Sequence, residues 1–452
     1  MPSADAIVAL RNLLEERLGA DRVYRPGHQA HDDALALWNG GVDARPALVV
    51  RPRDRAETAA VVTAAVASGV GLSVRGGGHD WAGRSLRDGG LVIDLGDLRG
   101  VEIVDGEAVV GGGARTADVV AAASAHGLNV ATGTAGVVGL AGLTLGGGYG
   151  PLVGTAGLAA DNLLGAEVVL ADGRLVSTDD DPELLWALRG GGGNFGVVTQ
   201  MRIRLHRDRG LVGGMVLFSF DEAETVLARY ADLLADAPDE LTLLLELTVV
   251  PGVGPSLLAV PVWSGEPDAA QAALDDVVAL GTPLSSTIGP AAQKDLLEQF
   301  DEQVPVGRHW SLRTRSVATL TPEVVDVLIA AAQERPGPGA GLGLRHFHGA
   351  ATRVGADDTA FGRRTNHVAI EISAGRGPDE DPAPYRAWVD SVSARLAPHA
   401  LPGGYPNFLK ADQTEQAALA YGDHAARLVE AKRTYDPTGV FTATPLPVGT
   451  AH

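Results

Sequence analysis

Three glycine-rich stretches contain the residues whose types and spacing point most clearly to chemistry. They are Arg75–Gly83 (RGGGHDWAG), Gly139–Gly150 (GLAGLTLGGGYG) and Arg189–Gly196 (RGGGGNFG). Consecutive glycines permit positive φ angles and let backbone N–H groups approach an anion without interference from a Cβ atom. A tight turn would explain any one of these stretches, but the three together favour one extended ligand that carries phosphate groups.

The third stretch has Gly191, Gly193 and Gly196 in the spacing of a dinucleotide-binding fingerprint. That fingerprint needs a strand before it and a helix after it, so that the helix N-terminus faces the pyrophosphate. Here the pattern predicts a helix before the glycines (Asp181–Gly190) and a strand after them (Phe195–His206). A Rossmann site is therefore excluded. The chain also lacks the Gly-Lys-Ser/Thr of a P-loop.

His79 is the most reactive side chain within these stretches. It follows a predicted strand (Gly71–Arg75) and stands among glycines, so it can approach a ligand closely as a hydrogen-bond donor or a nucleophile. An ordinary polar loop residue is an equally good interpretation of this histidine alone. A metal site is the weaker interpretation, because no second ligand stands at i+2 or i+4.

Short strands and helices are expected to position these stretches. Apolar spacing predicts a helix over Glu57–Val70 and a hairpin over Ala166–Ser177 with its turn at Asp172-Gly173. After Gly210–Gly214 glycine becomes rarer, and longer strands alternate with helices, as expected for a unit built on an antiparallel sheet. One further helix is expected over Gln413–Thr434.

Composition and charge restrict the classes of function. The 452 residues are 45% hydrophobic and 20% charged, which is typical of a folded protein. A net charge of −20 makes nucleic acid and acidic membranes poor partners. The absence of cysteine excludes disulfides, thiolate zinc sites and cysteine nucleophiles. We expect no signal peptide and no membrane span, and therefore a cytoplasmic protein.

Several motifs, taken in order, closely resemble those of a known family. RGGGHDWAG, GGLVIDL, GLTLGGGYG, DNLLGAEVVLADG and LLWALRGGGGNFGVV are similar to segments of the FAD-linked oxidases of the vanillyl-alcohol-oxidase/p-cresol-methylhydroxylase (PCMH) type. GGYPNF (Gly403–Phe408) and the closing RLVEAKRTYDPTGVF resemble the berberine-bridge-enzyme subfamily. The resemblance is strong over Pro46–His206 and clear over Tyr405–Phe441, and between them it extends only to the pattern.

The resemblance implies an α+β fold of two parts. Residues 1–210 would form a PCMH-type FAD-binding domain with its core over 42–207. Residues 211–400 would form an inserted α+β substrate domain built on an antiparallel sheet. Residues 401–452 would return to the FAD domain as a berberine-bridge-like segment.

The resemblance also assigns the residues that hold FAD. Arg75–His79 would cradle the pyrophosphate, and His79 would bond covalently to the flavin 8α-methyl group. Gly136–Gly148 would wrap the second side of the cofactor, while Asp161, Asn162 and 193–198 would line its adenine and ribose end. The expected contacts are Arg75, Gly76, Gly77, Gly78, His79, Gly83, Ala135, Gly136, Val138, Gly139, Gly142, Leu143, Gly146, Asp161, Asn162, Gly193, Gly196, Val198, Tyr405 and Asn407.

The chain departs from the family pattern at two places. Many relatives carry a second flavin link through a cysteine where Ala135 stands here, so we predict one covalent bond, through His79 only. FTATPLP (Phe441–Pro447) stands where relatives commonly have an Asn-Gln pair. The resemblance therefore does not imply which residues of this C-terminal segment contact the flavin.

Tyr405 and Asn407 are the predicted catalytic residues. A flavin accepts a hydride at N5, so the protein must hold the donor C–H there and take a proton from the attached heteroatom. Pro406 favours an extended backbone at Tyr405, and residues i and i+2 of an extended run share a face. Tyr405 would serve as base or hydrogen-bond acceptor and Asn407 would position the substrate. Tyr149 is a weaker candidate that packs beside the cofactor, and no metal is expected.

The predicted function is hydride removal from an alcohol, or from another C–H next to a heteroatom, of a small organic substrate. O2 would be the acceptor and H2O2 the product, in a tailoring step on a secondary metabolite. The alternatives are a flavin dehydrogenase with another acceptor and a flavin-scaffolded cyclase without redox turnover. Polar candidates for the substrate cleft are Arg308, His309, Arg313, Arg345, His346, His348 and Arg353. A solvated sheet face is the favoured interpretation of the pair His346 and His348.

Overall fold

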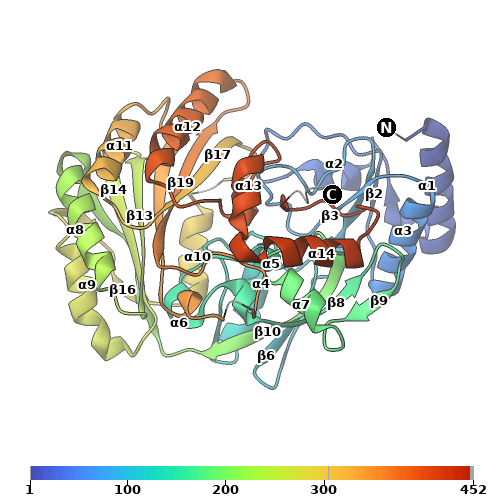
Figure 1. Cartoon of the computed structure of the whole chain (residues 1–452), viewed down its shortest axis with the longest axis horizontal. Coiled ribbons are helices and arrows are strands. Elements are labelled where there is room, and N and C mark those ends of the chain that lie inside the picture. The colour runs from blue at the N-terminus through green and yellow to red at the C-terminus, as the bar shows by residue number, and fades with distance from the viewer. Residues whose placement is uncertain (1, 304, 356, 448–452) are drawn as a thin grey trace.

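The structure, a computed structural model, describes residues 2–303, 305–355 and 357–447. Three sheets and the helices that cover them make up the chain, so the predicted α+β class is confirmed (Figure 1). Residue 1, residues 304 and 356, and 448–452 belong to the predicted domain ranges but lie outside the described residues. Within the described part of the chain, none of the helices has both the length and the apolar character that crossing a membrane requires.

The first sheet contains four strands in the order β1-β2-β4-β3. Their bounds are β1 (Val23–Tyr24), β2 (Leu48–Val50), β4 (Leu91–Asp94) and β3 (Leu72–Arg75). Strands β2, β4 and β3 run parallel, and β2 and β4 are buried on both faces, which explains the apolar runs Leu48–Val50 and 91–93. Helices α1 (Ala4–Leu18) and α3 (Arg55–Ala67) share the core of this sheet, whereas α2 (Gln29–Leu35) packs on the other side against β2.

The second sheet is antiparallel, with the order β5-β6-β10-β8-β9 and with β7 paired to β10. Its strands are β5 (Val101–Val104), β6 (Glu107–Gly111), β7 (Leu128–Val130), β8 (Leu163–Val169), β9 (Leu175–Ser177) and β10 (Val197–Arg207). The predicted hairpin is confirmed by the β8–β9 pairing, with Gly173 at φ 82° in the turn. The helices in this part are α4 (Thr116–Ser124), α5 (Leu140–Leu145), α6 (Val153–Ala156) and α7 (Pro182–Leu188).

The third sheet has nine strands, all antiparallel, and its main path is β15-β12-β14-β13-β18-β19-β17. The strands are β11 (Leu211–Gly213), β12 (Val216–Ser219), β13 (Leu241–Val250), β14 (Gly254–Trp263), β15 (Pro283–Ser286), β16 (Gly289–Ala291), β17 (His309–Val317), β18 (Ala340–Phe347) and β19 (His367–Arg376). Figure 1 shows helices on the outer side of this sheet, namely α8 (Ala223–Ala235), α9 (Ala270–Val278), α11 (Pro322–Gln333) and α12 (Pro382–Leu396). Helix α10 (Gln293–Asp301) contacts α4.

One local prediction was wrong because of backbone geometry at a glycine. The helix predicted over Gln413–Thr434 is two helices, α13 (Thr414–Ala420) and α14 (Ala425–Tyr435). Gly422 between them has φ 52°, which a right-handed helix cannot continue through. The second glycine-rich stretch contains the short helix α5 directly after Gly139.

The first two sheets are joined by a contact in which two backbones touch directly. A Cβ atom added to Gly77, after β3, would lie 2.2 Å from the backbone nitrogen of Gly139, before α5. A Cβ atom on Gly139 would lie 2.3 Å from the nitrogen of Gly77. No side chain fits at either position, so the first and second glycine-rich stretches are held against each other.

Gly77→Ala is expected to destabilise the protein by about 1–3 kcal/mol, because the methyl group overpacks a contact between backbones that cannot rotate away. The measurement is the thermal unfolding midpoint of the purified protein. Gly100→Ala is the matched control, since a Cβ atom there has no neighbour within 4 Å and its φ is not positive. Equal midpoints for the two variants would contradict the expectation.

Candidate functional site

A cavity of about 1090 Å³ lies where the three sheets meet. Its walls include all three glycine-rich stretches, the cavity-side residues of β13, β17, β18 and β19, and the C-terminal segment. The predicted site residues that line it are Gly76, Gly77, Gly78, His79, Ala135, Val138, Gly139, Gly142, Leu143, Tyr149, Gly193, Gly196, Val198, Tyr405 and Asn407. The volume exceeds the range of about 300–1,000 Å³ that is usual for small-molecule pockets, which suits a large cofactor together with a substrate.

His79 lines this cavity beside a stack of indole rings. Its imidazole lies parallel to the ring of Trp38 (centroids 4.6 Å apart, 15° between planes), and Trp38 stacks in turn on Trp310 at 5.0 Å. The Nε2 atom of His79 is buried and makes no hydrogen bond with any described residue. Burial lowers the pKa of His79 to about 4. The ring is therefore a neutral imidazole that has a fixed plane and a nitrogen with no structural hydrogen bond.

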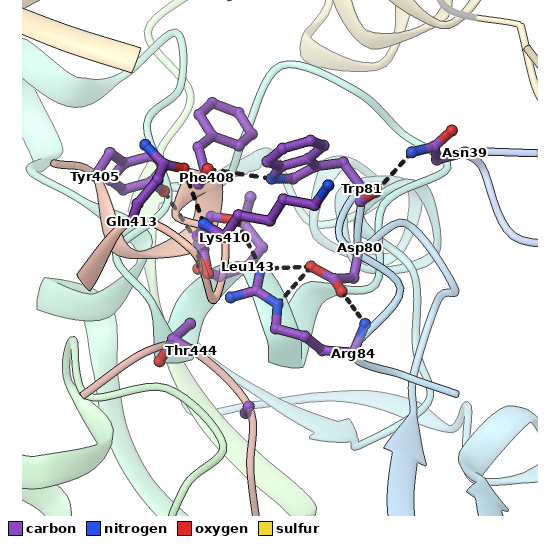
Figure 2. Close-up of polar contacts among 12 residues, drawn as sticks. Asn39, Asp80, Trp81, Arg84, Leu143, Tyr405, Phe408, Lys410, Gln413 and Thr444 are labelled. Atoms are coloured by element: carbon purple, nitrogen blue, oxygen red, sulfur yellow. Dashed lines mark hydrogen bonds and ion pairs between the residues drawn. The ribbon is translucent and has the colours of Figure 1, made fainter. Parts of the chain in front are cut away.

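The loop after His79 is tied to the C-terminal segment. Trp81 donates from Nε1 to the carbonyl of Phe408 (3.2 Å), and Arg84 donates to the carbonyl of Asn407 (2.9 Å). The Lys410 ammonium lies 5.4 Å from the centre of the Trp81 ring. Figure 2 shows Trp81 and Arg84 reaching this segment. Residues more than 300 apart in sequence thereby form one wall of the cavity.

Tyr405 and Asn407 lie side by side, although they do not belong to one extended run. The backbone of Tyr405 is extended, as predicted for a residue that precedes proline. Residues Pro406–Phe408 form a 3-10 turn rather than an extended run. The Tyr405 hydroxyl oxygen accepts hydrogen bonds from the backbone N–H of Gly148 (2.8 Å) and from Nδ2 of Asn407 (3.1 Å). Asn407 also donates to the carbonyl of Leu143 (3.0 Å). Burial raises the pKa of Tyr405 above its ordinary value, and these two hydrogen bonds oppose that rise.

A charged cluster on the nine-stranded sheet forms another wall. Glu246 on β13, Arg345 on β18 and Glu371 on β19 all line the cavity. Arg345 donates from Nε to Glu371 (3.3 Å). Arg345 was among the residues predicted for the substrate cleft, whereas neither glutamate was. The sequence did contain a signal for them, because each glutamate is the one carboxylate in a largely apolar predicted strand. Glu246 is in LTLLLELTVV and Glu371 is in HVAIEIS.

Tyr149 packs edge-on against Tyr405 with ring centroids 4.7 Å apart. Its hydroxyl donates to Nε2 of His367 (3.3 Å), because the Nδ1 of that histidine carries a proton shared with the carbonyl of Thr365. Burial raises the pKa of Tyr149 and lowers the pKa of His367 to about 4. Tyr149 therefore stays protonated, and its ring packs against Tyr405 and holds it in position.

His346 and His348 are not on a solvated sheet face, so the interpretation favoured from sequence was wrong. Both rings are 2% exposed and stack in parallel with centroids 4.1 Å apart. His348 follows the end of β18 and packs against Gly154 of α6. Of the other polar candidates, Arg308 and Arg345 line the cavity, whereas Arg313 pairs with Asp412 and Arg353 with Asp239.

Six predicted FAD contacts do not line the cavity, because their groups are used in its supporting structure. Asp161 forms an ion pair with Arg364, and Asn162 donates to the carbonyls of Ala156 and Leu158, so both side chains are engaged within the protein. The other four support the walls: Arg75 pairs with Asp94, Gly83 packs on Val42, Gly136 lies beside Asp301, and Gly146 leaves room for Asn407.

These residues fit a bound FAD. The glycine contacts form a cradle that side chains would fill, and His79 supplies an imidazole with no structural hydrogen bond of its own. Backbone N–H groups in such a cradle suit a pyrophosphate. Among the described residues no group of three or more His, Asp or Glu side chains is placed to hold a metal ion.

Comparisons with known proteins agree with this fit. The family described as FAD binding domain matches residues 46–179, and the family described as berberine and berberine like matches residues 404–445. The chain is 31% identical over 403 residues to an FAD-linked oxidoreductase, pgmH, of Aspergillus terreus, covering 80% of this chain and 79% of that protein. An FAD-linked oxidoreductase of Dictyostelium discoideum is 26% identical over 429 residues, covering 93% of this chain and 92% of that protein.

Solved structures show the same relationship. The crystal structure of 6-hydroxy-D-nicotine oxidase from Arthrobacter nicotinovorans superposes with a TM-score of 0.86 at 27% identity, covering 94% of this chain and 97% of that chain. Berberine bridge enzyme shares the fold, with a TM-score of 0.86 at 18% identity, covering 99% of each chain. The predicted resemblance is confirmed, and the chain belongs to the FAD-linked oxidoreductases of the PCMH type with a berberine-bridge-like C-terminal segment.

Proposed function

We propose that this FAD-dependent oxidoreductase is an oxidase that removes a hydride from a carbon bearing an alcohol or amine of a small organic substrate, with O2 as the acceptor. The observation that carries the proposal is the single cavity in which the glycine cradle and His79 share a space with Tyr405 and the charged cluster. The substrate gives up two electrons and two protons, and O2 receives them as H2O2. Bound FAD supplies the hydride acceptor.

His79 is proposed to carry the only covalent bond to FAD. The stack of Trp38 and Trp310 fixes the plane of its ring, and burial keeps the imidazole neutral and therefore nucleophilic. The bond replaces one hydrogen of the flavin 8α-methyl group and the imidazole N–H proton, and O2 accepts the two electrons released. A second bond would need a side-chain nucleophile at position 135, where this chain has Ala135.

Tyr405 is proposed to hold the substrate heteroatom and to receive its proton. Its hydroxyl oxygen already accepts hydrogen bonds from Gly148 and Asn407, and these donors stabilise the phenolate that a proton acceptor must provide. Asn407 keeps the phenol in place through its second hydrogen bond to Leu143. Edge-on packing by Tyr149 and Phe408 excludes water from the ring of Tyr405.

The purified protein is expected to stay yellow after acid precipitation and to be heavier than its polypeptide by one FAD. Peptide mapping should place the added mass on the peptide that contains His79. In His79→Ala the colour should separate from the precipitate, whereas His126→Ala, an exposed histidine, should behave as the unsubstituted protein. Added mass on any other peptide would overturn the assignment.

Tyr405→Phe is expected to slow anaerobic flavin reduction by about 100-fold or more, the usual contribution of a positioned acid–base group. In the unsubstituted protein the reduction rate should rise with pH, because burial keeps the pKa of Tyr405 above its ordinary value. Stopped-flow absorbance measures both. Tyr24→Phe is the control, because the hydroxyl of Tyr24 donates to the carbonyl of Asp21 and Tyr24 does not line the cavity. An unchanged rate of flavin reduction in Tyr405→Phe would show that another residue accepts the substrate proton.

Reoxidation by O2 separates an oxidase from a dehydrogenase. Photoreduced protein mixed with O2 in a stopped-flow instrument is expected to reoxidise within the turnover time and to release one H2O2 per flavin. Slow reoxidation together with fast electron transfer to a quinone would show that the acceptor is not O2.

A further inference from the structure

Glu246 is a half-buried carboxyl group to which the proposed reaction assigns no role. Along β13, Leu243, Leu245 and Leu247 belong to the core under the outer helices. Side chains alternate between the two faces of a strand, so Glu246 projects from the opposite face, where it lines the cavity. A carboxylate at the centre of an apolar strand costs stability unless it is paired, so its position needs an explanation.

The neighbours of Glu246 leave it without a hydrogen bond. Across the sheet it lies opposite Leu258 of β14 on one side and Gly343 of β18 on the other, and Gly343 lies opposite Glu371 of β19. The nearby cation, Arg345, gives its hydrogen bond to Glu371. None of the described residues donates a hydrogen bond to Glu246.

The missing side chain at Gly343 leaves open space between the two carboxylates. A Cβ atom added there would meet only the Cβ atom of Glu371 at 3.7 Å and a methyl group of Leu244 at 3.9 Å. A ligand atom placed over Gly343 would therefore lie in line between Glu246 and Glu371.

The charges that line the cavity do not balance. Asp80, Glu246, Glu302 and Glu371 are acidic, whereas Arg84, Arg308 and Arg345 are basic, so four acidic groups face three basic ones. Arg84 pairs with Asp80 and Arg345 pairs with Glu371. The chain as a whole carries a net charge of −20, which attracts cations towards the opening. Of the two cavity carboxylates that form no ion pair with a described residue, Glu302 is exposed to solvent and Glu246 is half-buried on the sheet, so Glu246 is the one that a bound cation would pair with inside the cavity.

We propose that Glu246 selects substrates that carry a protonated amine, whose ammonium group binds its carboxylate over Gly343. The inference rests on the proposed function, because it assigns the substrate class of the same cavity. An ammonium group supplies both the charge and the N–H donors that the described residues do not provide to Glu246.

The binding should depend on pH in a definite direction. Burial raises the pKa of Glu246 to about 7; Arg345 opposes this rise and Glu371 adds to it. The third neighbour, Leu258, is apolar. Since the ammonium group binds the ionised carboxylate, affinity should increase from about pH 6 to about pH 8, a range in which an alkylamine remains protonated.

The test uses the purified FAD-containing protein and two pairs of probes of matched shape: benzylamine with benzyl alcohol, and 1-naphthylmethylamine with 1-naphthylmethanol. Binding is measured without O2 from the change in the flavin absorption spectrum. At least one amine should bind about tenfold or more tightly than its alcohol, as expected for a desolvated charge pair. Glu246→Gln should abolish this preference and its pH dependence, whereas Glu302→Gln, a second carboxylate of the cavity wall, should retain both.

Each other outcome counts against the proposal. Equal binding of amine and alcohol, or a preference that survives in Glu246→Gln, would show that the carboxyl group acts as a neutral hydrogen-bonding group or not at all. Absence of binding by all four probes would overturn the amine assignment as well. FAD content and the thermal unfolding midpoint of Glu246→Gln establish that it folds. A failure of the proposed function appears separately, as a protein without FAD or with flavin that no substrate reduces.

Discussion

The contact between the backbones of Gly77 and Gly139 is the constraint on which the site depends. It leaves no room for a Cβ atom on either side, so the strand that leads to His79 and the helix α5 approach as closely as two chains can. Between strands the backbone would satisfy its hydrogen bonds with a partner strand. Here no described residue accepts a hydrogen bond from the N–H groups of Gly77 and Gly78, which line the cavity. The close contact thus positions His79 and forms the cradle at the same time.

The opposite wall of the cavity follows from the alternation of side chains in the nine-stranded sheet. One face of β13, β18 and β19 supplies the leucines and isoleucines that pack under α8, α11 and α12. The other face of the same strands supplies Glu246, Arg345 and Glu371. Stability and chemistry are therefore coupled, because a shift of register by one residue would place the charges in the core and the leucines in the cavity.

The C-terminal segment completes the site by returning to both of these walls. Tyr405 accepts a hydrogen bond from Gly148, and Trp81 and Arg84 hold the carbonyls of Phe408 and Asn407. Helix α14 packs beside α7 of the second sheet, so the core of that part is assembled from both ends of the described chain.

Sequence alone determined most of the local elements and pointed to FAD as the cofactor, because glycine runs, hairpin turns and apolar periodicity are properties of neighbouring residues. It identified His79, the hairpin β8–β9 and the family. It did not determine what Asp161 and Asn162 bind, why Tyr405 and Asn407 meet, or where His346 and His348 lie, since each depends on partners distant in the chain. Glu246 and Glu371 were missed for the same reason. The tertiary structure decides which face of the sheet borders the cavity and which residues lie opposite each carboxylate, and neither can be derived from the sequence of a single strand.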